Sequence, residues 1–130
     1  MKTAQELLGA AVDIIERDGW HQGSLYEGSN EEWVGGAEQH GRHVELGKTA
    51  PVCAMGAVYR AAVGTAYVDS VIASFEMQQL VKQAMSLLTR AMCDQSAAAG
   101  RRNYGIASFN DDPRTSREDV VLAMKTAASS

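Results

Sequence analysis

Apolar residues near the start of the chain recur at intervals of three and four positions, the period of a helix with one buried face. They are Leu7, Leu8, Ala11, Val12, Ile14 and Ile15. Thr3 and Glu6 have the spacing of a capping box, in which two side chains satisfy free backbone N–H groups at a helix start. Gly19 is a residue that can end a helix. The pattern therefore predicts a helix over residues 4–18.

The next helical pattern covers residues 51–63 and combines small and bulky apolar side chains. Thr49, Ala50 and Pro51 resemble a helix start, because proline is tolerated in the first turn, and Gly64 offers an end. We expect a central, well-packed helix here.

A longer apolar pattern predicts one helix, or two consecutive helices, over residues 68–98. Beyond it, residues 106–109 have the pattern of a short extended piece, and Asn110–Pro113 has the composition of a turn. Thr115 to Glu118 forms a second capping box, which predicts a last helix.

The segment from Gly19 to Pro51 lacks a helical period. It holds seven of the chain's twelve glycines and all three histidines. Residues 32–34 and 43–46 alternate between polar and apolar, which predicts a small β-hairpin. A connection this long is more often functional or mobile than inert, although its glycine content is equally typical of disorder.

Together these elements predict a mainly α fold, a compact bundle of about four helices with a long Gly-rich loop. A chain of 130 residues, 45% of them hydrophobic, fits a single domain over residues 1–130. Such a domain needs neither a metal nor a disulfide to fold, so no cofactor is expected. The apolar faces of residues 68–98 allow packing within one chain or in a homodimer.

Charge and cysteine content narrow the function classes. The formal charge is −4, and the basic residues are scattered apart from Arg101 and Arg102, which disfavours nucleic acid as a partner. No apolar stretch has the length of a membrane span, and the first residues lack the apolar centre of a signal peptide. Cys53 and Cys93 lack the spacing of zinc ligands. We expect a reduced, cytoplasmic protein.

Three short motifs follow one another along the chain: Gly19–Gly23, Cys53–Ala57 and Ile106–Asp111. In this order the chain resembles a family of small uncharacterised proteins of actinobacteria and their phages, which share GW-x-QG, CA-x-GA and FND- or WND-like motifs. The resemblance implies no reaction, cofactor or partner. It supplies candidate binding positions, which are Trp20, Gln22, Gly23, Cys53, Asn110 and Asp111.

Cys53 offers the most chemistry, because a thiol in the first turn of a helix feels the positive end of the helix dipole. A small buried core residue is the more common role of a free cysteine, and we favour it here. Gln22 and Gly23 invite comparison with papain-like enzymes, in which a glutamine stabilises the oxyanion. Those enzymes place their histidine after the cysteine, whereas none follows His43, so a cysteine protease is disfavoured.

The other candidates are weaker. Asn110–Pro113 offers carboxylates to a divalent cation, but the same residues make a turn, which we favour, and we expect no metal site. Trp20 and Trp33 are expected to pack against the core. Gly41–His43 is interpreted as a surface cluster, and the glycine spacings match no phosphate-binding motif.

Three functional hypotheses follow. The favoured one is a non-enzymatic protein that binds a host or phage macromolecule, most simply a protein, through residues 20–47 and 106–113. The alternative is a thiol-dependent enzyme or small-molecule-binding domain, centred on Cys53, in which Gln22, Asn110 and Asp111 meet. In a third, purely structural reading, the motifs are a folding signature, compatible with the first hypothesis.

Overall fold

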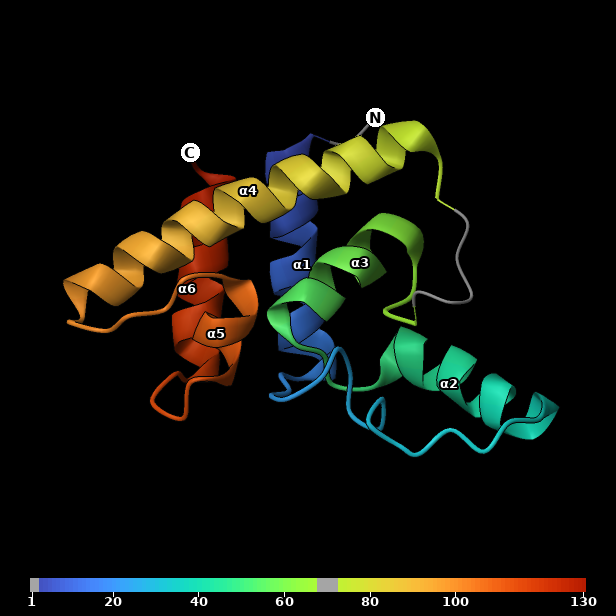
Figure 1. Ribbon diagram of the computed structural model, residues 1–130. Coiled ribbons are helices and arrows are strands. Elements are labelled where there is room, and N and C mark those ends of the chain that lie inside the picture. Colours follow the sequence, from blue (N-terminus) through green and yellow to red (C-terminus); the bar gives the residue numbers. More distant parts are fainter. Residues whose placement is uncertain (1–2, 68–72) are drawn as a thin grey trace.

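The computed structural model describes residues 3–67 and 73–130, which form six helices (Figure 1). These are α1 (Ala4–Asp18), α2 (Ala37–Thr49), α3 (Ala54–Val63), α4 (Phe75–Ala98), α5 (Ile106–Asp111) and α6 (Arg117–Ala128). The described residues contain no strand beyond two isolated bridges, so the mainly α prediction is confirmed. The expected number of helices, about four, is too low for the described residues. The helix predicted over residues 68–98 corresponds to α4, and residues 68–72 of that prediction lie outside the described residues.

The first and last helices begin with side-chain caps. Thr3 caps α1 by accepting a hydrogen bond from the Glu6 backbone N–H at 3.1 Å, and the predicted bounds 4–18 are confirmed. The second capping box lies one residue later than expected. Ser116 and Asp119 form it, each side chain accepting a hydrogen bond from the other's backbone N–H, at 3.2 and 2.9 Å.

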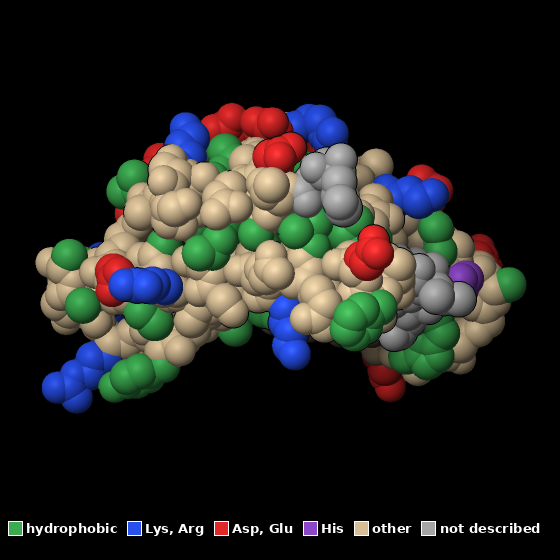
Figure 2. All heavy atoms as spheres, turned by 90° about the horizontal axis from the view of Figure 1, so that it is seen from above, with side chains coloured by type: hydrophobic (Ala, Val, Ile, Leu, Met, Phe, Trp, Pro, Cys, Tyr) green, Lys and Arg blue, Asp and Glu red, His purple; other side chains and the backbone are tan. Residues whose placement is uncertain are grey.

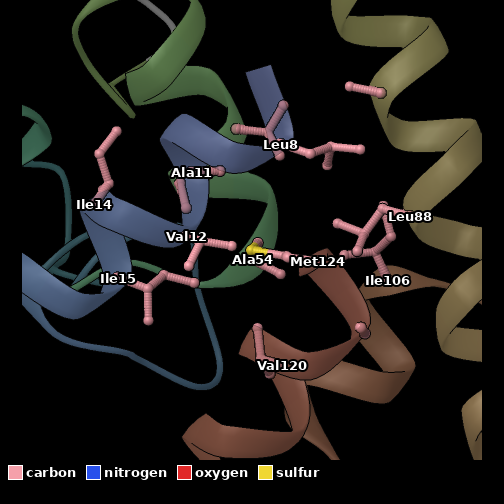
Figure 3. Close-up of a cluster of buried hydrophobic side chains, with 14 of the residues drawn as sticks. Leu8, Ala11, Val12, Ile14, Ile15, Ala54, Leu88, Ile106, Val120 and Met124 are labelled. Carbon is pink, nitrogen blue, oxygen red and sulfur yellow. The ribbon is translucent and has the colours of Figure 1, made fainter. Parts of the chain in front are cut away.

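The core lies around α1, which packs most extensively against α3 and α6, while α4 crosses α1 and α6 (Figure 1). Side chains from α1, α3, α4, α5 and α6 meet there (Figure 3). The labelled residues of this cluster are Leu8, Ala11, Val12, Ile14, Ile15, Ala54, Leu88, Ile106, Val120 and Met124. Since burial of apolar area is the main favourable term in folding, this cluster fixes the helices to which the other segments attach.

Gly9 is the one glycine inside α1, and a Cβ added there would meet no atom within 4 Å. We expect Gly9→Ala to stabilise the protein by about 0.5–1 kcal/mol, because alanine reduces the freedom of the unfolded chain and favours the helix. Urea denaturation measures the change. Gly56→Ala is the contrasting control, since its Cβ would collide with the Leu25 carbonyl oxygen. A destabilised Gly9→Ala protein would contradict this packing of α1.

The predicted β-hairpin is wrong, because residues 43–46 lie inside α2. Side-chain bonds that sequence patterns do not reveal form the start of this helix. The Gln39 side chain accepts hydrogen bonds from the Val34 and Gly35 N–H groups, both at 3.0 Å, and donates to the Glu32 carbonyl at 2.9 Å. The segment before α2 is thereby bound to its first turn.

Residues 106–109, expected to be extended, form most of α5 instead, and this prediction is also wrong. Asn110 and Asp111 consequently lie in the last turn of that helix rather than in a loop. Only Asp112 and Pro113 remain from the predicted turn. The helix is short and follows Gly105, which offers no side-chain cap, and for this reason local signals do not reveal it.

The helix predicted over residues 51–63 begins three residues later, at Ala54. The chain before it is extended, because Val52 forms isolated bridges to Trp20 and to Tyr26. The Val52 carbonyl accepts from the His21 N–H at 3.0 Å, and the Cys53 N–H donates to the Leu25 carbonyl at 3.0 Å. This pairing binds the segment after α1 to the start of α3.

The surface carries charges of both signs. On the face drawn in Figure 2, Lys and Arg side chains lie interspersed with Asp, Glu and hydrophobic ones. Among the helices that the structure describes, none combines the length and the apolar composition that crossing a membrane requires. α2 makes no extensive contact with another described helix, and it lies to one side of the core in Figure 1.

Candidate functional site

The three sequence motifs meet at Asn110, a side chain only 1% exposed. Its Oδ1 accepts a hydrogen bond from the Trp20 indole Nε1–H at 2.7 Å and one from the Ala54 backbone N–H at 3.0 Å. Its Nδ2 group donates to the His21 carbonyl at 3.0 Å. One amide side chain therefore joins the segment after α1 to the first residue of α3 and to α5.

Gln22, Gly23 and Asp111 complete this arrangement. The Gln22 side chain donates to the Asn110 and Asp112 carbonyls, both at 3.0 Å. The Asp111 Oδ1 accepts from the Gly23 backbone N–H and from the Asn110 side chain, both at 2.9 Å. We call Trp20, Gln22, Gly23, Asn110 and Asp111 the Asn110 junction.

The Asn110 junction holds the fold together by hydrogen bonds within the chain. An asparagine amide offers two acceptor sites and two donors, and Asn110 uses all four on protein groups. A buried amide that is fully bonded in this way has no capacity left for a ligand. Five of the six predicted site residues are thus brought together.

The sixth, Cys53, is buried directly before Ala54, whose N–H bonds Asn110, and it caps α3. Its sulfur accepts a hydrogen bond from the Gly56 N–H at 3.3 Å. Burial raises the pKa of the Cys53 thiol above its ordinary value, and the negative charge of Asp111 adds to this rise, while hydrogen bonds from the backbone of α3 only partly oppose it. In this part of the described chain no hydrogen bond joins the thiol to Gln22 or Asp111. The arrangement keeps the thiol protonated near neutral pH.

The two cysteines are expected to differ in reactivity. Cys53 is 8% exposed, whereas Cys93 on α4 is half-buried. At neutral pH we expect a thiol reagent to modify Cys53 at least about tenfold more slowly than Cys93. The reagent has little access to the buried Cys53 sulfur, and little of the Cys53 thiol is present as the reactive thiolate. The single-thiol variants Cys53→Ser and Cys93→Ser separate the two rates. A Cys53 that reacts faster than Cys93 at neutral pH would restore the thiol-enzyme hypothesis.

The acidic residues near the Asn110 junction are already engaged. Asp112 accepts from the Arg114 backbone at 2.9 Å and from its guanidinium at 2.9 and 3.1 Å. These bonds hold the pKa of Asp112 far below its usual value. Over residues 3–67 and 73–130, no three His, Cys, Asp or Glu side chains gather as a metal ion would require.

A second candidate region lies beside α2, in a hollow of about 370 Å³ that aromatic side chains line. We call it the aromatic hollow. Its residues come from the segment before α2, from α2 itself and from the chain after α3. They are Leu25, Tyr26, Ser29, Glu31, Trp33, His43, Ala66 and Tyr67.

His43 lies at the centre of these rings and is 3% exposed, so its assignment to a surface cluster is wrong. Its Nδ1 lies 2.6 Å from the Tyr26 hydroxyl oxygen. Its Nε2 lies 3.3 Å from a Glu31 carboxylate oxygen and makes no hydrogen bond of good geometry. The imidazole centroid is 5.8 Å from the Tyr26 ring, 5.9 Å from Trp33 and 5.6 Å from Tyr67.

The Glu31 side chain lines the aromatic hollow and is ionised. The Arg42 guanidinium donates to both of its oxygens, and these bonds lower the pKa of Glu31. Trp33, expected in the core, is 57% exposed, and its neighbour Val34 is 81% exposed. The prediction for Trp33 is therefore wrong, whereas Trp20 is half-buried and packs against the core.

The sequence patterns did not point to Tyr26, Glu31, His43 or Tyr67 as one group. The available signal was the spacing of Gln39, His43 and Gly47, the buried residues of α2, which recur every four positions. A strand over residues 43–46 would separate Gln39 from His43, so the predicted hairpin is incompatible with the helical period of these residues. Tyr67 follows α3, so only the tertiary fold brings it to α2.

Comparison with known proteins identifies one family. Residues 1–130 match the model of a protein family described as a family of unknown function (DUF6197). No curated protein and no solved structure shows a significant match to the chain. The geometry of the Asn110 junction and of the aromatic hollow is therefore the basis for a functional proposal.

Proposed function

The chain belongs to DUF6197, a family of unknown function, and we propose that it is a non-enzymatic protein that binds a partner protein at the aromatic hollow. The supporting observation is the exposure of Trp33 and Val34 at the edge of a hollow lined by aromatic rings. Tryptophan is among the residues enriched in the centres of protein interfaces, and exposed apolar groups beside a concave surface favour contact with a partner.

The state of the other motif residues favours binding over catalysis. Asn110 has every polar group satisfied inside the protein, and the Cys53 thiol is buried with a raised pKa. These features fit a folding signature, the third of the hypotheses drawn from the sequence. The binding surface proposed from the sequence, residues 20–47 and 106–113, is accordingly narrowed to residues 25–47 together with Tyr67.

The cellular setting of the proposal follows from the resemblance of the motifs. We place the protein in the cytoplasm of an actinobacterial cell or of one infected by a phage. The partner is a host or phage protein rather than nucleic acid, because the chain carries a net charge of −4. A second copy of the chain is the other partner that the sequence leaves open.

An affinity pull-down from actinobacterial lysate tests the proposal. Tagged wild-type protein is compared with Trp33→Ala and Val34→Ser, and with Leu122→Ala, which removes an exposed apolar side chain from α6. Point substitutions are preferable to deletion of residues 28–47, which would remove most of α2. We expect a protein captured by wild type and by Leu122→Ala to be lost with Trp33→Ala and reduced with Val34→Ser.

Circular dichroism checks that each variant keeps its helices. Equal capture by all four proteins would reject the aromatic hollow as the binding surface. Self-association that requires Trp33 would instead identify the second copy as the partner, and analytical ultracentrifugation distinguishes this result.

A further inference from the structure

The net charge of the protein is concentrated in residues 27–47, which contribute Ser29, Glu31, Trp33 and His43 to the aromatic hollow. Residues 27–47 contain five glutamates and one arginine, a formal charge of −4. The remainder of the chain has eleven acidic and eleven basic residues, so its charges cancel. All five glutamates are exposed, namely Glu27, Glu31, Glu32, Glu38 and Glu45. This segment therefore attracts positively charged groups.

The aromatic hollow itself has the chemistry that a cation prefers. Trp33, Tyr67 and the Glu31 carboxylate all line the hollow, and the two rings pack at a tilt against His43, with centroid distances of 5.9 and 5.6 Å. Aromatic faces attract ammonium and guanidinium groups through the ring quadrupole, most strongly for tryptophan. Arg42 holds Glu31 in place but is not among the residues that line the hollow.

We infer that the aromatic hollow receives the side chain of a lysine or arginine from a basic segment of the partner protein, an inference that rests on the proposed function. The ring faces of Trp33 and Tyr67 contact the cation, and Glu31 accepts its hydrogen bonds. A carboxylate has about four lone-pair positions, so it can accept from an incoming cation while it stays bonded to Arg42.

The same features disfavour other occupants. An anionic group would meet the Glu31 carboxylate in a segment whose formal charge is −4. A purely apolar side chain would remove water from the Glu31 carboxylate and add no hydrogen bond to those from Arg42, which costs free energy. A cationic side chain alone satisfies both the rings and the carboxylate, because its aliphatic stem is apolar and its end is charged.

An NMR titration with two short peptides tests this inference on the whole protein. One peptide alternates glycine and lysine, and the other has glutamine in place of each lysine. The two indole N–H signals provide an internal comparison, since Trp33 lines the hollow and Trp20 is bonded to Asn110. We expect the lysine peptide to shift the Trp33 signal and to leave Trp20 unchanged, and the glutamine peptide to shift neither.

Two matched variants test the role of the carboxylate. Glu31→Gln is expected to weaken binding of the lysine peptide about fivefold or more, because it removes the charge at the hollow. Glu38→Gln changes an exposed glutamate of α2 that does not line the hollow, and we expect less than about a twofold effect.

Three results would overturn the inference: an unchanged Trp33 signal, an equal response to the glutamine peptide, or equal weakening by the two glutamate variants. Equal weakening by the two glutamate variants would mean that the negative charge of the whole segment attracts the peptide, without a specific binding site for one cation. The pull-down separates this failure from failure of the proposed function. A partner that is lost with Trp33→Ala but retained with Glu31→Gln would support protein binding at the aromatic hollow and contradict recognition of a lysine or arginine side chain there.

Discussion

Replacing Asn110 by alanine is expected to destabilise the fold by about 3–5 kcal/mol. The substitution leaves three buried or half-buried groups without partners, namely the Trp20 indole N–H, the Ala54 N–H and the His21 carbonyl. Each unsatisfied buried group costs about 1–3 kcal/mol, and Asn110 is too deeply buried for water to replace its amide readily.

Urea denaturation, followed by circular dichroism, measures this loss against Asn30→Ala, an exposed asparagine in the segment before α2. We expect that control to change the free energy of unfolding by less than about 0.5 kcal/mol. Hydrogen exchange of the Trp20 indole gives an independent signal, since its N–H should exchange faster in Asn110→Ala. Equal midpoints for wild type and Asn110→Ala would show that the Asn110 junction does not support the fold.

The Asn110 junction also shows how far sequence patterns reach. The order of the motifs around Trp20, Cys53 and Asn110 predicts that their residues form a group, and hydrogen bonds join five of the six candidate residues in the structure. What the sequence did not contain was the nature of the contact. Whether an asparagine is bonded inside the protein or open to a ligand depends on residues 88 to 90 positions away, which no local pattern specifies.

The helices also differ in whether their own residues are enough to predict them. α1 was predicted with its bounds because Thr3, the apolar period and Gly19 lie within that segment. α2 was missed because its period consists of Gln39, His43 and Gly47, only one of which is an aromatic ring and none an aliphatic side chain. Bonds from outside the helix stabilise α2, and through it His43 of the aromatic hollow. The strongest of these come from Arg60.

Replacing Arg60 by methionine is expected to destabilise the protein by about 3–5 kcal/mol and to release α2. Arg60 lies on α3, is 4% exposed, and donates to the carbonyls at the end of α2. The acceptors are Gly47 at 2.8 Å, Ala50 at 2.8 Å and Leu46 at 3.2 Å. Methionine retains much of the apolar stem, but the end of α2 then loses its donors.

The effect is distinguishable from the loss of an ion pair, because Arg60 also donates to Asp18 Oδ2 at 2.9 Å. Arg17 bonds the same carboxylate at 2.7 and 2.8 Å from an exposed position, so Arg17→Met is a matched control. We expect that control to cost less than about 1 kcal/mol, as exposed ion pairs usually do. In Arg60→Met, amide hydrogen exchange should accelerate throughout α2 by a larger factor than in α1. Equal destabilisation by the two variants would assign the contribution of Arg60 to Asp18, whereas selective opening of α2 would show that Arg60 also maintains the aromatic hollow.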